Sequence, residues 1–100
     1  MPQAVVEAEA LQAALQTLWA QTGRERSKTA AIWSIDVGGL SIEWGEAQVA
    51  LGDSGDGFGS VKLSGALMRS VRDRAPTSGN LTVGFARGKL HVASMTYDVS

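Results

Sequence analysis

The chain has 100 residues, enough for one domain with a modest hydrophobic core. Apolar residues make up 44% and charged residues 19%, which is typical of a folded chain rather than a disordered one. The absence of cysteine excludes disulfides, thiol nucleophiles and thiolate metal sites, and no apolar run reaches the roughly 18 residues of a membrane span. We therefore expect a single domain over residues 1–100, a cytoplasmic location and no membrane partner.

The net charge of −1 is unevenly distributed along the chain. Residues 1–59 carry three basic and eight acidic side chains, a net of −5, whereas residues 60–100 carry six basic and two acidic side chains, a net of +4. Such polarity suits head-to-tail self-association, or one basic face turned toward an anionic partner. A solvated surface with uneven charges is the alternative, and it stays open.

The first elements predicted are a short strand over Ala4–Val6 and a helix from about Ala8 to Gln21. The helix carries one apolar stripe at the spacing i, i+4, i+7, i+8, formed by Leu11, Leu15, Leu18 and Trp19. The opposite face is small and nearly neutral, with Glu9, Ala13, Gln16, Thr17 and Ala20. Gly23 is suited to end the helix, and residues 24–28 form a mostly basic connector.

A β-hairpin is the clearest local prediction. Apolar residues alternate with polar ones on both sides of Gly38–Gly39, at Trp33, Ile35 and Val37 before it and at Leu40, Ile42 and Trp44 after it. Glycine takes positive φ without strain, so the pair predicts a tight turn. Ala47, Val49 and Leu51 continue as a third strand. Both tryptophans fall on the apolar phase, which favours core packing over ligand stacking.

The second part of the chain follows a similar order. Gly52–Gly59 is predicted to be a mobile glycine-rich loop, followed by a strand containing Val61 and Leu63. Ser64 caps a helix that extends to about Ala75, with a buried stripe of Leu67, Met68, Val71 and Ala75. A hairpin then turns at Arg87–Gly88, with apolar residues at Leu81, Val83 and Phe85 and at Leu90 and Val92. The alternation changes phase before Met95, which predicts a bulge or break near Ala93–Ser94.

The two parts can be overlaid as a repeat. Val5–Leu11 aligns with Val61–Leu67 without a gap, and Leu15 then falls on Val71. Three positions in the aligned stretch are identical, so the similarity lies in the pattern of elements. The sequence therefore predicts an α+β fold with a duplicated strand-helix-hairpin-strand unit, in halves of about residues 1–51 and 60–100 joined by the loop 52–59.

Signals for catalysis and metal binding are weak. Gly52–Gly55 resembles the surroundings of a serine nucleophile, but Ser54 would need a histidine base, and the only histidine, His91, falls in a predicted hairpin. Asp53 and Asp56 do not have the spacing of an EF-hand loop, and no Gly-Lys-Ser/Thr marks a phosphate loop. His91 has no second metal ligand nearby in sequence. We therefore expect no enzyme, no cofactor and no metal site.

The candidate binding residues are basic side chains. Arg69 and Arg72 on the second helix are the strongest candidates for phosphate contacts, with Lys62, Arg74 and Arg24 as lesser ones. Arginines on a helix contact the nucleic-acid backbone without reading bases, and such binding depends strongly on salt. No aromatic residue is interleaved with them, so stacking on single strands is not indicated. A solvated helix face is the alternative.

The order strand-helix-hairpin-strand, given twice in a domain of this size, resembles one domain of the DNA sliding clamps, the processivity factors of DNA polymerases. The stretch that looks most like a bacterial clamp domain is Gly59–Leu67, followed by Pro76 and the hairpin from Leu81–Val83 to Lys89–Val92. The resemblance covers nearly the whole chain. It implies two helices packed on antiparallel sheet, in a ring of domains whose helices line a central hole for duplex DNA. Known clamps place six domains around the ring, so a ring of this chain would need six copies.

We therefore expect a non-enzymatic clamp-like protein that self-associates, as a homo-oligomer or ring, and contacts the backbone of duplex DNA without sequence specificity. The first helix departs from this pattern, because its outward face has no lysine or arginine. Glu7 and Glu9 near its start also have the wrong sign for phosphate, although they suit the helix dipole. The alternative is a structural or protein-interaction module of the same fold, with a protein partner and no nucleic acid.

Overall fold

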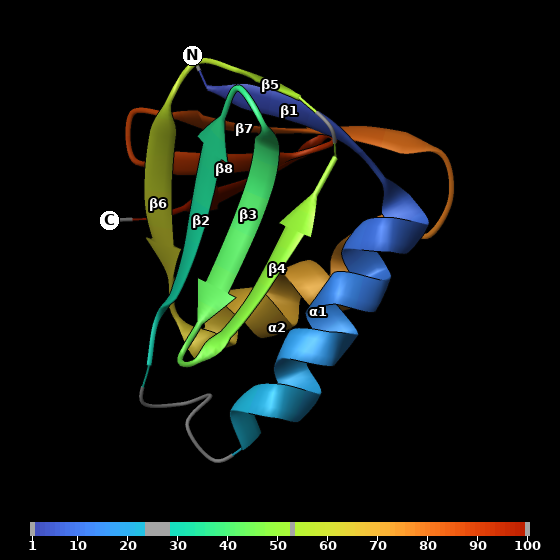
Figure 1. The fold of residues 1–100 in the computed structure, drawn as a ribbon, viewed down its shortest axis with the longest axis vertical. Coiled ribbons are helices and arrows are strands. Elements are labelled where there is room, and N and C mark those ends of the chain that lie inside the picture. Colours follow the sequence, from blue (N-terminus) through green and yellow to red (C-terminus); the bar gives the residue numbers. More distant parts are fainter. Residues whose placement is uncertain (1, 24–28, 53, 100) are drawn as a thin grey trace.

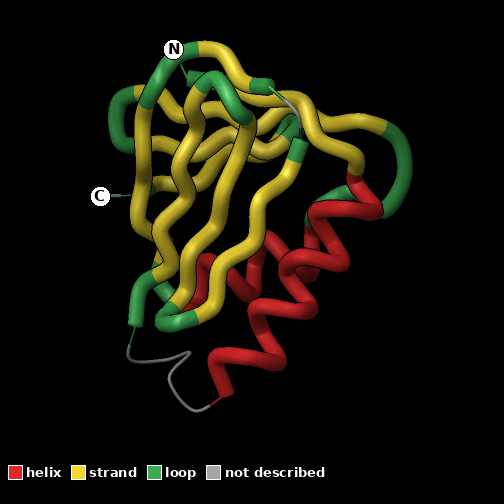
Figure 2. The backbone as a smooth tube through the Cα atoms, in the orientation of Figure 1, coloured by secondary structure: helices red, strands yellow, loops and turns green. Residues whose placement is uncertain are grey.

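The computed structural model describes residues 2–23, 29–52 and 54–99, which contain two helices and nine strands. The elements in chain order are β1 (Gln3–Glu7), α1 (Ala8–Thr22), β2 (Ala31–Asp36), β3 (Gly39–Trp44), β4 (Ala47–Leu51), β5 (Gly55–Asp56), β6 (Gly59–Leu63), α2 (Gly65–Arg74), β7 (Asn80–Ala86), β8 (Lys89–Val92) and β9 (Met95–Asp98). Figure 1 shows both helices at one side of the strands, and Figure 2 shows the same separation by colour. The predicted α+β class is confirmed.

The strands form two antiparallel sheets, and each sheet takes one strand from the other half of the chain. The sheets have the orders β5-β1-β7-β8-β9 and β4-β3-β2-β6. β1 pairs with β7, with Val5 opposite Thr82, and β6 pairs with β2, with Val61 opposite Trp33. Neither half completes a sheet by itself, so the fold depends on pairing between residues far apart in sequence.

The core lies between the sheets and the helices. Trp33 and Trp44 are both 0% exposed, which confirms the core role predicted for them. The indole N–H of Trp44 donates to the Thr29 carbonyl at 2.7 Å, so burying the ring leaves no orphaned donor. The predicted stripe of α1 faces this core: its leucines are buried and Trp19 is half-buried. The residues predicted for the opposite face of α1 are Glu9, Ala13, Gln16, Thr17 and Ala20, and all are exposed.

The second helix begins and ends where the sequence predicts. Ser64 is its N-cap, and its hydroxyl accepts a hydrogen bond from the Leu67 N–H at 3.2 Å. Met68 and Val71 are buried on its inner face. The helix stops at Ala75, because a residue before proline is driven out of the helical region.

The first hairpin differs from the prediction by one residue. β2 ends at Asp36, which pairs with Gly39, so the turn is Val37–Gly38 rather than Gly38–Gly39. The Asp36 carboxylate accepts a hydrogen bond from the Gly38 N–H at 2.7 Å, a local turn interaction that aspartate favours. Val37 therefore leaves the buried alternation and is 67% exposed.

The glycine-rich segment 52–59 was predicted to be a loop, but it contains a short strand. β5 pairs with β1, with Asp56 opposite Gln3, and the Gly55 N–H donates to the Val37 carbonyl at 3.2 Å. A β-carbon at Gly55 would collide with the Asp36 carbonyl, so only glycine lets the chain pass this close. Because the segment has no apolar alternation, sequence periodicity did not reveal the strand.

The predicted break at Ala93–Ser94 is confirmed, and it is a turn that reverses the chain between β8 and β9. Ala93 has a φ of 55°, the left-handed region that tight turns use. The change of phase follows from this reversal, because Tyr97 reaches the core from the new strand β9 and Val99 from the residue just after it.

The overlay of the two halves matches burial at some positions and not at others. Leu15 and Val71, which are aligned, are both buried. Val6 is buried, whereas its aligned residue Lys62 is exposed. The aligned helices also differ, because Leu18 is buried and its aligned residue Arg74 is exposed. The division into repeated halves stays a prediction.

Candidate nucleic-acid interface

α2 presents the main basic surface among the candidate residues that the structure describes. With Met68 and Val71 turned inward, Arg69 and Arg74 are exposed to solvent. Arg72 lies on the same helix and is half-buried. The helix therefore carries three cations on about two turns, against the single carboxylate of Asp73.

Arg72 lies between the two helices rather than in open solvent. Its Cζ atom is 4.0 Å from the centroid of the Trp19 ring, close enough for a cation–π interaction. Its Nε donates to Asp73 Oδ1 at 3.2 Å. The side chain keeps 26% of its exposure, so ligands can still reach it. The sequence placed Arg72 at the flank of the stripe but gave no sign of its contact with Trp19.

Gln12 joins the two helices through their backbones and was missed by the sequence reasoning. Its side-chain amide lies 3.2 Å from the Arg72 carbonyl and 3.3 Å from the Ala75 carbonyl. These carbonyls belong to the last turn of α2, where backbone acceptors have no partner within the helix. The contact fixes the basic end of α2 against α1. A polar residue beside the apolar stripe of α1 was the only signal in the sequence.

Lys62 lies apart from this group, on β6. It is exposed and lines an open hollow of about 370 Å³ together with Ser64, Leu67, Asp98 and Val99. Arg24 falls outside the described residues. The structure therefore brings Arg69, Arg72 and Arg74 together on one helix and leaves Lys62 on a neighbouring strand.

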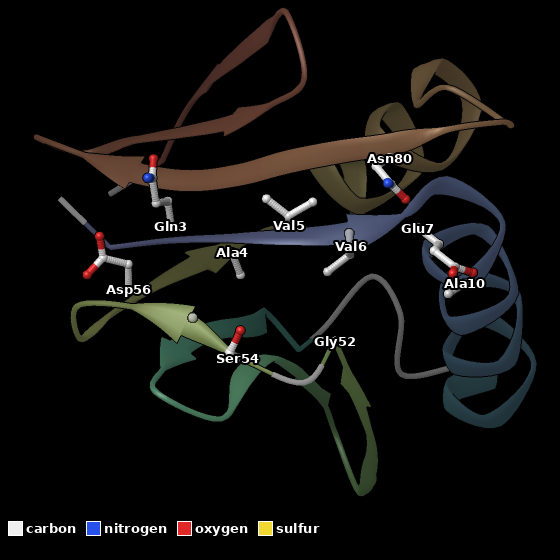
Figure 3. A pocket seen from close by; sticks show the side chains of 11 residues that line it. Gln3, Ala4, Val5, Val6, Glu7, Ala10, Gly52, Ser54, Asp56 and Asn80 are labelled. Atoms are coloured by element: carbon white, nitrogen blue, oxygen red, sulfur yellow. The ribbon is translucent and has the colours of Figure 1, made fainter.

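A second hollow, of about 670 Å³, runs along β1 (Figure 3). Its polar side chains include Glu7, Ser54, Asp56 and Asn80. Its charged side chains are acidic, so it does not suit phosphate, and no basic residue or histidine is among the described residues that line it. The hollow adds nothing to the basic surface on α2.

The residues considered for catalysis do not form a site. Ser54 precedes β5, while His91 lies in β8, and the sheet order places β1 and β7 between those strands. His91 Nδ1 is 3.1 Å from Thr96 Oγ1, its partner across the β8–β9 ladder. Asp53 lies outside the described residues. Within the described ranges, no group of three histidine, cysteine, aspartate or glutamate side chains is placed to hold a metal ion.

Neither helix in the described part of the chain is long and apolar enough to cross a membrane.

No protein-family model matches this sequence, and no curated protein matches it. Solved structures, however, share its fold. The DNA polymerase sliding clamp from Pseudomonas aeruginosa superposes with a TM-score of 0.68 at 14% identity, over 100% of this chain and 30% of the clamp chain. The DNA polymerase III subunit beta of the same organism gives 0.65 at 15% identity, over 98% of this chain and 29% of that one.

A third structure, the Pseudomonas aeruginosa DnaN sliding clamp bound to griselimycin, has a TM-score of 0.66 at 16% identity and covers 99% of this chain. This chain spans about 30% of the length of these subunits. At such low identity the likeness establishes the fold alone. The chain is an α+β domain with the fold of a DNA sliding-clamp domain.

Proposed function

We propose that this protein is a non-enzymatic, clamp-like domain that self-associates and contacts the backbone of duplex DNA without reading its sequence. The observation that carries the proposal is the coincidence of a clamp-type fold with three arginines on α2, of which Arg69 and Arg74 are exposed and Arg72 is half-buried but accessible. Arginines in this arrangement neutralise phosphates and release counterions, which gives affinity without specificity. Lys62 and Arg24 remain lesser candidates for the same contacts.

Free strand edges support self-association. Within the described residues, β9 pairs only with β8 and β6 pairs only with β2, while β4 ends the same sheet as β6 on the opposite side. Unpaired edges are templates for pairing with another chain. An edge on one side of a domain joined to an edge on the other side of the next produces a head-to-tail chain, which becomes a ring if the rotation closes. The split between a negative first half and a positive second half suits the same arrangement.

A structural or protein-interaction module is the second candidate function. It is favoured by α1, whose exposed face carries no lysine or arginine. A surface that lines DNA would be expected to be basic on both helices. In this alternative the same fold binds a protein partner and no nucleic acid.

The first test measures duplex DNA binding by fluorescence anisotropy at several salt concentrations. We expect affinity to fall steeply with salt, and the double variant R69Q/R74Q to lower the slope of log K against log[salt] by about 0.9 per lost phosphate contact. The matched control is R87Q/K89Q, which removes the same charge at the β7–β8 turn. Equal effects of the two variants would indicate non-specific attraction to net charge and would count against an interface on α2.

The second test is the solution mass measured by light scattering over a range of concentrations. A stable hexamer, or a lower oligomer able to close, supports the ring. A persistent monomer that also fails to bind DNA favours the protein-interaction module.

A further inference from the structure

A row of two indole rings and one guanidinium leads from the core to the basic surface. Arg72 Cζ lies 4.0 Å from the centroid of the Trp19 ring. Trp19 meets Trp44 edge-on, with the ring centroids 5.6 Å apart and the planes at 64°. Trp44 is fully buried and is held by its hydrogen bond to Thr29. The guanidinium therefore rests on a ring that the core itself holds in place.

This arrangement leaves the end of the Arg72 side chain available for a ligand. Within the described part of the chain, the guanidinium has one polar partner, the Asp73 carboxylate at Nε. The cation–π contact uses a face of the group, whereas its N–H donors lie in the guanidinium plane and suit the oxygens of a phosphate. At 26% exposure, the side chain is accessible without being fully solvated.

We infer that Trp19 is a positioning residue, which holds the Arg72 guanidinium so that its terminal amino groups face a phosphate of duplex DNA. This inference rests on the proposed DNA contact and adds to it a residue of α1, the helix that carries no cation of its own. Trp19 is not itself a ligand for DNA in this arrangement. It acts through Arg72.

The physical advantage is pre-organisation. A free arginine samples many rotamers and loses that freedom when it binds a phosphate. Arg72 is already restricted by Trp19 and Asp73, so less freedom is lost on binding. Arg69 provides an internal comparison, because it is exposed and has no ion pair or side-chain hydrogen bond within the described residues. Its contribution to affinity should not depend on Trp19.

A double-mutant cycle on duplex affinity tests the inference. We expect W19L to weaken binding of a labelled duplex about 2- to 5-fold, the lower part of the cost of ordering one long side chain on binding. In an R72Q background W19L should have no further effect, because the group that it positions is gone. In an R69Q background W19L should have its full effect. Equal effects of W19L in the R72Q and wild-type backgrounds would overturn the inference.

Trp19→Phe provides a variant that keeps an aromatic face and disturbs packing less than leucine. We expect its affinity to lie between those of wild type and W19L, with far-UV circular dichroism unchanged. An affinity of W19F no better than that of W19L in a folded protein would also contradict a role for the ring face.

Acrylamide quenching of tryptophan fluorescence adds a readout that overall stability does not affect. Trp33 and Trp44 are fully buried, so quenching reports mainly on Trp19. Duplex DNA should protect Trp19 in the wild type and not in R72Q. If the wild type binds no DNA, the proposed function fails. If R69Q/R74Q weakens binding while W19L does not, the positioning role alone fails.

Discussion

The indole N–H of Trp33 donates to the Sδ atom of Met68 across 3.2 Å, joining the middle of β2 to the buried face of α2. Both side chains are almost completely buried, at 0% and 1% exposure. Trp33 is the central apolar residue of a strand that β6 and β3 flank. This bond therefore fixes the basic helix on the four-stranded sheet, and it satisfies a donor that water cannot reach.

Met68→Leu tests how much this hydrogen bond contributes to stability, because leucine has a similar side-chain volume but lacks the sulfur acceptor. We expect the free energy of unfolding to fall by about 1 kcal/mol, the lower end of the cost of a buried unsatisfied donor, since sulfur is a weak acceptor. Urea unfolding followed by tryptophan fluorescence measures the change. The control is Met95→Leu, at a half-buried methionine whose neighbouring Tyr97 hydroxyl lies 3.5 Å away. Equal losses in the two variants would show that the indole bond contributes nothing particular.

Among small substitutions in the first hairpin, Gly39→Ala is expected to cause one of the largest losses of folding stability. Gly39 has a φ of 119°, and a β-carbon there would lie 2.6 Å from the Leu51 carbonyl oxygen of β4. Backbone strain of this kind costs about 1–3 kcal/mol. The measurement is the midpoint of urea denaturation, with Gly38→Ala as the neighbour control.

The control position, Gly38, differs from Gly39 in its φ angle and in the space available for a β-carbon. Gly38 has no positive φ, and its β-carbon would meet only the Asp36 carboxylate oxygen, at 3.2 Å, which can rotate away. We expect Gly38→Ala to change stability by no more than about 0.5 kcal/mol. A larger loss of stability for Gly38→Ala than for Gly39→Ala would favour the turn at Gly38–Gly39 that the sequence alone predicted.

Ser64→Ala removes the N-cap of α2. The hydroxyl accepts from the Leu67 N–H at 3.2 Å, and loss of such a cap typically costs about 1 kcal/mol. The drop in the melting temperature, followed by thermal unfolding, measures this loss of stability. Ser60→Ala is the matched control, since Ser60 is an exposed strand residue of β6. If both serines proved equally dispensable, the start of α2 would depend on packing of Met68 and Val71 alone.

Local periodicity was enough to predict both helices, the hairpin strands and most of the core. The α1 stripe and the Ser64 cap depend on residues within a few positions of one another, so the sequence displays them directly. β1 joins the sheet of the second half of the chain, and β6 joins the sheet of the first half. This arrangement depends on pairing between residues far apart in the chain, such as Val5 and Thr82. No local pattern encodes that choice.

The candidate site was predictable in part for the same reason. The spacing of Arg69, Arg72 and Arg74 along one helix is visible in the sequence. The contact of Arg72 with Trp19 is not, because it depends on how α2 packs against α1. The sequence predicted the first turn at Gly38–Gly39, because a Gly-Gly pair is a strong turn signal. The hydrogen bond from the Gly38 N–H to the Asp36 carboxylate accompanies a turn at Val37–Gly38 instead, and the pattern of apolar residues does not reveal it.

Thr96→Pro tests whether the free edge of β9 is used for self-association. The Val99 N–H donates to the Gly88 carbonyl at 2.8 Å, and hydrogen bonding alternates along an antiparallel ladder. The Thr96 N–H therefore faces away from β8, toward the open edge. Proline at 96 removes a donor that the domain itself does not use, and edge strands tolerate proline at such positions. We expect light scattering to show loss of the oligomer with the domain still folded.

The matched control is Thr96→Val, which loses the contact between Thr96 and His91 just as proline does, but keeps the backbone N–H. If β9 is an assembly edge, the valine variant should retain the oligomer and the proline variant should not. If both variants keep the wild-type mass, assembly uses another edge, and the same test moves to β4 or β6. If both become monomeric, the His91–Thr96 side-chain pair, rather than the backbone edge, controls association.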